Sequence, residues 1–197
     1  MKTFLSFAFA LISLSTQAAP EARIVSLEGI VTFQGKPVQL DTRITGDGEF
    51  KVGEKSVVKI FLSESRSTVV LGANTTSLVL LAHTPGHPNV NLAHGSARWI
   101  SGDVKSNKIG GGIRTKNAML TLKGTDFLAS YHPLLGETET VCFDGTVQLR
   151  STGKADDEKL VSKNQWSGIG GRFGSVTAGV LSLSPEVITY YQKQLPR

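Results

Sequence analysis

The sequence predicts an all-β domain, either a single antiparallel-rich β-sandwich or an irregular β-coil, with one short C-terminal helix. Two observations lead to this prediction. From Arg23 to Leu183, short apolar or alternating runs rich in β-branched residues follow one another, separated by clusters of glycine and polar residues. No stretch before residue 184 shows helical periodicity.

The expected strands are short and closely spaced. They cover residues 24–33, 56–62, 68–71, 77–81, 89–93, 97–100, 118–122, 127–131, 138–143 and 146–150. Turn signals lie between them at residues 46–48, 72–74, 85–86 and 110–112, where glycine or proline favours a reversal of the chain.

Three glycines belong to a weak internal repeat of the sequence. Gly29, Gly95 and Gly145 each precede a strand in which apolar residues alternate. Each is expected to be a turn residue that starts a strand. The spacing between them is not constant, so the weak repeat does not predict a solenoid of fixed period.

The chain changes character at Ser184. This residue has the properties of an N-cap, Pro185 suits the first helical position, and Glu186 places an acid in the first turn. The apolar residues that follow share one helix face: Val187, Ile188, Tyr191 and Leu195. We expect a short helix that covers the sheet as a lid; a partner-binding helix is the alternative.

The N-terminus has the pattern of a secretory signal peptide. Lys2 is followed by an apolar run over residues 4–14 and then by small residues up to Ala19. That run is well below the roughly 20 residues that a membrane span needs. We expect cleavage after Ala18, so residues 1–18 are the signal peptide and residues 19–197 form one periplasmic or secreted domain without a transmembrane segment.

Charge and cysteine content exclude some function classes from the prediction. The net charge is +5, but the lysines and arginines are scattered and form no basic stripe interleaved with aromatic residues, so no nucleic-acid partner is expected. Cys142 is the single cysteine, so no intramolecular disulfide is possible. It lies in an apolar run and is expected to be a buried hydrophobic residue, not a nucleophile.

No cofactor, metal or catalytic residue is predicted. His83, His87 and His94 are the best candidate ligands for a metal, but Pro85 prevents the helix that would align the first two. A nucleophile elbow and a phosphate-binding loop are absent from the sequence. We therefore expect a protein that is not an enzyme.

Two further clusters are interpreted as structural. The glycines at 110–112, with Gly168, Gly170 and Gly171, are expected to form turns, because neither group lies between a strand and a helix as a dinucleotide site requires. The acids at 156–158 lie between Lys154 and Lys159 and are expected to form a solvated hairpin tip.

The segment 113–127 contains two alternating runs joined through Gly124, which predicts a bulge or a close backbone approach at that residue. With the strand that follows, it carries an ordered set of motifs. These are Thr115 and Ala118, then Gly124, Thr125 and Phe127, then Asp144, Gly145 and Val147.

Over about residues 50–150 this pattern resembles the FecR domain, the periplasmic part of sensor proteins that pass iron-uptake signals from an outer-membrane receptor to a sigma factor. Lys116 and Lys123 stand where the family usually has proline and arginine, and residues 63–65 lack its common Asp-Gly turn. The sensors carry a sigma-binding segment and a membrane helix before this domain, whereas a signal peptide is expected here. The resemblance therefore implies a non-catalytic interaction module, and sigma-factor control is not carried over with it; whether a link to sigma-factor signalling remains is left open.

Two binding hypotheses follow. The first is an envelope protein-interaction or signal-sensing module that works by strand-edge pairing or through a groove beside Gly124. The alternative is a glycan or cell-wall binding module, in which Trp99, Trp166 and Tyr131 stack on sugar rings. Buried tryptophans would count against the glycan hypothesis. A hydrolase with dispersed catalytic residues is the least supported class, because no catalytic constellation is evident.

Overall fold

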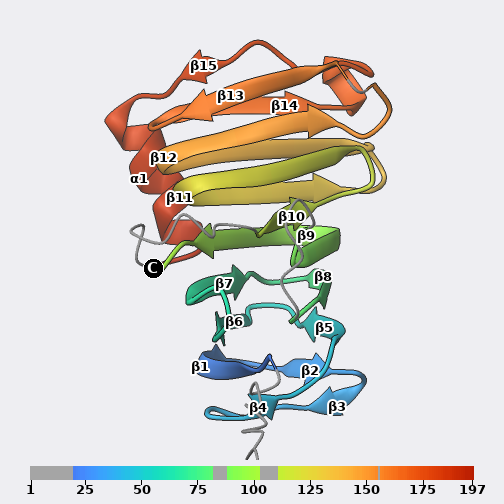
Figure 1. The fold of residues 1–197 in the computed structure, drawn as a ribbon, viewed down its shortest axis with the longest axis vertical. Coiled ribbons are helices and arrows are strands. Elements are labelled where there is room, and N and C mark those ends of the chain that lie inside the picture. Colours follow the sequence, from blue (N-terminus) through green and yellow to red (C-terminus); the bar gives the residue numbers. More distant parts are fainter. Residues whose placement is uncertain (1–19, 82–87, 103–110, 155) are drawn as a thin grey trace, which may run out of the picture.

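A computed structural model describes residues 20–81, 88–102, 111–154 and 156–197. The predicted signal peptide, His83, His87 and Gly110 lie outside these residues. The strands form one continuous sheet of 15 strands, which stack along the long axis of the molecule (Figure 1). The all-β prediction is confirmed, and of its two forms the single continuous sheet fits the irregular β-coil.

The elements follow one another in chain order. They are β1 (Ala22–Glu28), β2 (Val31–Phe33), β3 (Lys36–Pro37), β4 (Arg43–Ile44), β5 (Gly48–Val52), β6 (Val57–Leu62), β7 (Ser67–Leu71), β8 (Thr75–Val79), β9 (Val90–Ile100), β10 (Gly112–Arg114), β11 (Ala118–His132), β12 (Glu137–Ser151), β13 (Glu158–Ser162), β14 (Gln165–Ile169), the 3-10 turn η1 (Gly171–Phe173), β15 (Leu181–Ser182) and α1 (Pro185–Gln194). Within the described residues, α1 is the single α-helix.

The sheet folds over on itself, because its long strands belong to two ladders. The second part of β9 pairs with β7, whereas its first part pairs with β8. In the same way β12 pairs with β14 through its first part and with β13 through its second. We call the ladder of β1, β6, β7 and β14 the first half of the sheet. The ladder of β2, β5, β8, β10 and β13 is the second half.

Glycines stand where the long strands pass from one half to the other. Gly95 in β9, Gly124 in β11 and Gly145 in β12 have φ of 95°, 61° and 76°. These are conformations that side chains strongly disfavour. The β11–β12 ladder also shifts register between Lys123 and Asp126, which confirms the bulge predicted at Gly124.

One hydrophobic core lies between the two halves. Alternate residues of each half point inward, as the pleat of a strand requires. The first half contributes Ile24, Ile60, Val69, Trp99 and Phe127, and the second half contributes Phe50, Val79, Leu92, Leu120 and Leu149. All of these side chains are at most 2% exposed.

The helix covers the outer face of the first half, as the lid prediction expected (Figure 1). Ser184 is the N-cap residue and Pro185 the first helical residue. Ile188 and Leu195 are buried in a second apolar cluster, where they pack with side chains of four strands: Val70, Ile100, Leu128, Val141 and Phe143. Val187, predicted to share the buried face, is instead exposed. The outer face of the second half has no such cover from α1.

Several predicted strand boundaries are wrong. The run 24–33 is two strands, because the chain bends at Gly29, whose φ is 79°. The pairs 89–93 with 97–100, 118–122 with 127–131, and 138–143 with 146–150 are each one long strand, because the corner glycines bend the strands without ending them. The interpretation of Gly95 and Gly145 as turns before new strands is corrected accordingly.

Other predicted turns belong to strands. Gly48, expected in a turn, opens β5, and Gly112 opens β10. Gly168 lies buried within β14, while Gly170 and Gly171 flank the start of η1. The acids at 156–158 lie at the end of the β12–β13 hairpin, as predicted, and Asp156 is exposed, but Asp157 is engaged by another segment. Asp157 accepts hydrogen bonds from the backbone N–H and the hydroxyl of Thr177, at 2.7 and 2.6 Å, and Glu158 begins β13.

Among the described residues no helix is long and apolar enough to cross a membrane.

Candidate binding groove

The motif residues predicted to be structural hold the fold together. Thr115 is buried; its hydroxyl accepts the backbone N–H of Ala118 at 3.0 Å and lies 2.7 Å from the hydroxyl of Thr138. The amide of Asn117 donates to the carbonyl oxygens of Gly136 and Ile169. These bonds tie the turn before β11 to the hairpin after it.

The second and third parts of the motif form a corner of the sheet. A Cβ atom on Gly145 would collide with the carbonyl oxygen of Gly124. Two other motif side chains, Phe127 and Val147, are fully buried in the core. Asp144 differs, because it is exposed and forms a 3.1 Å ion pair with Lys163. Most of the motif therefore shapes the chain, and Gly124 is not among the residues that line the groove on the other half of the sheet.

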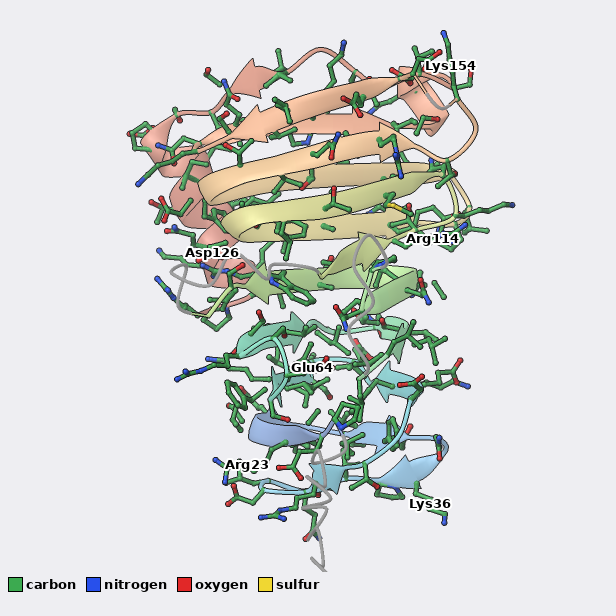
Figure 2. All side chains as sticks on the ribbon, viewed as in Figure 1. Arg23, Lys36, Glu64, Arg114, Asp126 and Lys154 are labelled. Atoms are coloured by element: carbon green, nitrogen blue, oxygen red, sulfur yellow. The ribbon has the colours of Figure 1, made fainter. Side chains whose placement is uncertain are left out.

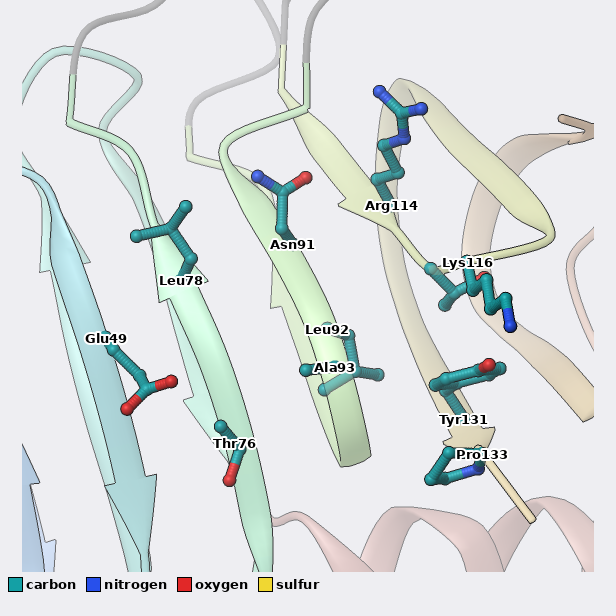
Figure 3. A pocket seen from close by; sticks show the side chains of 11 residues that line it. Glu49, Thr76, Leu78, Asn91, Leu92, Ala93, Arg114, Lys116, Tyr131 and Pro133 are labelled. Atoms are coloured by element: carbon teal, nitrogen blue, oxygen red, sulfur yellow. The ribbon is translucent and has the colours of Figure 1, made fainter. Parts of the chain in front are cut away.

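The principal groove lies on the uncovered outer face of the second half (Figure 3). It has a volume of about 620 Å³. Its floor comes from outward-facing residues of three neighbouring strands: Glu49 of β5, Thr76 and Leu78 of β8, and Asn91 and Ala93 of β9. On the other side stand Arg114, Lys116, Tyr131 and Pro133 (Figure 3).

A local interruption of the ladder creates this groove. Strand β10 runs parallel to β9, and its last paired residue, Arg114, lies opposite Asn91. The chain then turns away from β9, because the N–H of Thr115 donates to the carbonyl of Ala118 at 2.9 Å. Strand β11 reaches β9 again only at Tyr131, which lies opposite Gly95. Residues 92–94 of β9 therefore have no ladder partner on this side.

Positive charge dominates the groove. Arg114 and Lys116 form no ion pair with any other residue that the structure describes. The one acid, Glu49, is engaged by Lys51 at 3.1 Å. Unpaired cations beside a hollow favour an anionic ligand through charge complementarity.

An apolar hairpin tip borders the groove. Pro133 lines it, and the next residues of the β11–β12 hairpin, Leu134 and Leu135, are 100% and 61% exposed. Two adjacent leucines in water are unfavourable unless a partner covers them.

A buried ion pair lies on the opposite side of the molecule, beneath α1 (Figure 2). Arg98 and Asp126 form a bidentate pair of 2.7 and 2.8 Å, and both side chains are almost fully buried. Arg98 also donates to the carbonyl of Leu195 at 2.6 Å and stacks 4.6 Å from the centre of the Phe143 ring. Arg98 joins the sheet to the end of the helix and is 3% exposed.

The other candidate residues are not brought together. Burial raises the pKa of the Cys142 thiol to about 12, with further contributions from the charges of Asp144 and Asp126. The thiol is therefore neutral near pH 7 and does not act as a nucleophile. His94 is exposed on β9; the described residues contain no group of three metal-binding side chains, and the rest of the predicted histidine set lies outside them.

The aromatic residues proposed to bind sugars are mostly interior. Trp99 is fully buried in the core and Tyr131 is 3% exposed. Trp166 is partly buried against the second apolar cluster. A stacking platform on a sugar ring needs an exposed aromatic face, which Trp99 does not offer.

Comparison with known structures shows what this fold is similar to. Two crystal structures, at 1.65 and 2.50 Å resolution, are of a protein from Parabacteroides distasonis proposed to be an anti-sigma factor. They match with TM-scores of 0.57 and 0.58 at 16% and 15% identity, over 73% and 74% of this chain. The chain spans just under two thirds of their length, 64% and 65%. The likeness is one of fold. No protein-family model and no curated protein matches the sequence.

Proposed function

We propose that this protein is an exported, non-catalytic, FecR-like interaction module of the bacterial envelope, which binds a partner protein through the groove beside β9. The observation that carries this proposal is the interrupted ladder. Residues 92–94 of β9 have no ladder partner on this side, and Leu92 and Ala93 line a groove of about 620 Å³ on the outer face that α1 leaves uncovered. Strand edges of this kind accept extended segments of other chains.

The structural neighbours support a regulatory or signalling role. FecR-type sensors act on sigma factors, and the P. distasonis protein is described as an anti-sigma factor. The FecR motif residues occupy the corner and seam positions of this fold, which is where a family-defining structural motif is expected. The fold likeness and the motif thus point to the same class of signalling protein.

The non-catalytic part of the proposal rests on the state of the candidate groups. The Cys142 thiol is held neutral by burial, and the Asp126 carboxylate is held by two hydrogen bonds from Arg98. Cys142 is fully buried and Asp126 is 7% exposed, so neither group is presented openly to a substrate. The glycan alternative is weakened by the burial of Trp99 and Tyr131.

Site-specific photo-crosslinking in cells that export the protein tests the proposal. A photoreactive residue in place of Ala93, which is exposed and lines the groove, should give a discrete crosslinked protein. The matched position is Lys159, which is exposed on β13 of the same half but lies outside the groove. Equal crosslinking from both positions, or none from Ala93, would contradict binding through the groove.

Export is tested separately by intact-mass measurement of the protein recovered from the periplasm or medium. The mass should correspond to a chain that begins at Ala19. A mass that includes Met1 in exported material would show that the signal peptide is not removed as proposed.

A further inference from the structure

We infer that the groove binds a short, extended, acidic segment of the partner protein, which pairs as an added strand with residues 92–94 of β9 and places carboxylates on Arg114 and Lys116. This inference rests on the proposed function and names the chemistry of the segment that the groove takes.

The backbone of β9 is free on one side at residues 92–94. Residues 92–94 lie between two paired stretches of β9. Their polar groups on this side have no ladder partner in the described part of the chain. On the other edge, Leu92 and His94 pair with β8, and the register shift between them leaves Ala93 unpaired. A segment inserted there gains main-chain hydrogen bonds while β8 holds the residues on either side of Ala93.

The size of the interruption limits the length of the segment that can bind there. Three strand residues at about 3.3 Å each span about 10 Å. The space therefore takes three or four extended residues between the end of β10 and the start of the β9–β11 ladder. Sugar rings and lipid headgroups have no alternating donors and acceptors at strand spacing, so an extended peptide satisfies the free edge best.

The two cations of the groove favour acidic side chains on the bound segment. Arg114 stands at one end of the groove, beside Asn91, and Lys116 lies on the same side of the groove as Arg114 (Figure 3). Arg114 is the last residue of β10, and Lys116 lies in the turn that follows it. Both cations line the groove, so acids on an added strand would meet positive charge there.

The apolar hairpin tip extends the same surface. Leu134 and Leu135 follow directly on Pro133, so a segment that leaves the groove on this side passes two exposed leucines. An apolar residue flanking the acidic positions of the segment would cover them and reduce the exposed apolar area.

A peptide titration of the full exported chain tests the inference. The probe is a fluorescent octapeptide in which glutamate and valine alternate, and its binding is followed by fluorescence anisotropy at low salt. We expect binding that weakens about tenfold in the variant Arg114→Glu/Lys116→Glu. The matched control Lys36→Glu/Arg43→Glu changes the net charge equally at exposed cations outside the groove and should bind as the wild type does.

Two altered probes test the contribution of charge and that of backbone hydrogen bonds separately. Replacement of glutamate by glutamine should weaken binding about tenfold, and N-methylation of alternate backbone amides should abolish it, because it removes the donors of an added strand. An acidic peptide that binds equally well after N-methylation, or equally well to the groove variant and the control variant, overturns the inference.

The outcomes also distinguish this inference from the proposed function. If Ala93 crosslinks a partner but the acidic probe does not bind, the groove is a docking site for another chemistry and only the inference fails. If neither the crosslink nor the probe binding is observed, both fail.

Discussion

The buried ion pair beneath α1 provides the sharpest test of the packing described above. Replacement of Asp126 by alanine leaves the Arg98 guanidinium buried with the Leu195 carbonyl and the Phe143 ring as its remaining contacts. Removal of one partner of a buried pair typically costs about 3–5 kcal/mol, because the other charge stays desolvated. Net stabilities of about 5–15 kcal/mol are usual, so Asp126→Ala should lose a large part of the free energy of unfolding.

Urea unfolding followed by tryptophan fluorescence measures this loss, since Trp99 is buried in the core that unfolds. The control is the neighbouring exposed pair of Asp144 and Lys163, whose atoms are 3.1 Å apart and whose side chains are 69% and 63% exposed. Asp144→Ala should cost less than about 1 kcal/mol, because water screens an exposed pair. Similar costs for the two alanine variants would refute the reasoning.

A double variant separates charge from packing. Arg98→Met/Asp126→Ala removes both charges and leaves an apolar side chain under the helix, so it should be more stable than Asp126→Ala alone. Hydrogen exchange of the α1 amides should accelerate in every variant that lacks the bond from Arg98 to Leu195. Single-variant costs that add to the double-variant cost within about 0.5 kcal/mol would show that the two residues are not coupled.

Three further predictions concern the corner, the core and the thiol. Gly145→Ala should cost more than Gly35→Ala in urea unfolding. Both glycines have φ of 76°, which costs an alanine about 1–2 kcal/mol, but only at Gly145 does the added Cβ meet another backbone, that of Gly124. Phe127→Ala should lose about 3–5 kcal/mol, and a wild-type melting temperature would show that Phe127 is not a core residue. The Cys142 thiol, whose pKa is raised from 9.0 to about 12, stabilises the fold fully below about pH 9 and loses that contribution as pH rises towards 12. The stability difference between wild type and Cys142→Ala should therefore shrink by about 1.4 kcal/mol per pH unit above pH 9, and a constant difference would contradict the shift.

Local pattern was sufficient to predict the fold class, the buried thiol and the helix. Burial alternates along the run from Val57 to Leu62 because one face of the strand packs on the core. The sequence pattern that causes this can be recognised without tertiary information. The start of α1 was predicted for the same reason, since N-cap and proline preferences act within one turn. The motif glycine Gly124 was predicted to be a bulge, because no other residue type tolerates that conformation as well.

Strand continuity was beyond local pattern. A glycine between two alternating runs indicates a turn as readily as a corner, and only the ladders on either side of Gly95 and Gly145 show that each strand continues. Strand β14 was missed because its residues 165–169 include polar and small residues, and its pairing with β12 supplies the order that its own propensity lacks.

The sequence by itself determined which residues prefer the interior and where the chain bends, because burial and backbone preference are properties of single residues and their neighbours. Only the tertiary structure decided the groove. It exists because β10 stops at Arg114 while β11 rejoins β9 at Tyr131, and this interruption depends on pairings between residues far apart in the chain. The same pairings place Arg114 beside Asn91 in the groove, although neither residue carries a signal in the sequence that predicts the other's position. Pairing between distant strands brings the groove residues together, whereas local preference acts only within each segment.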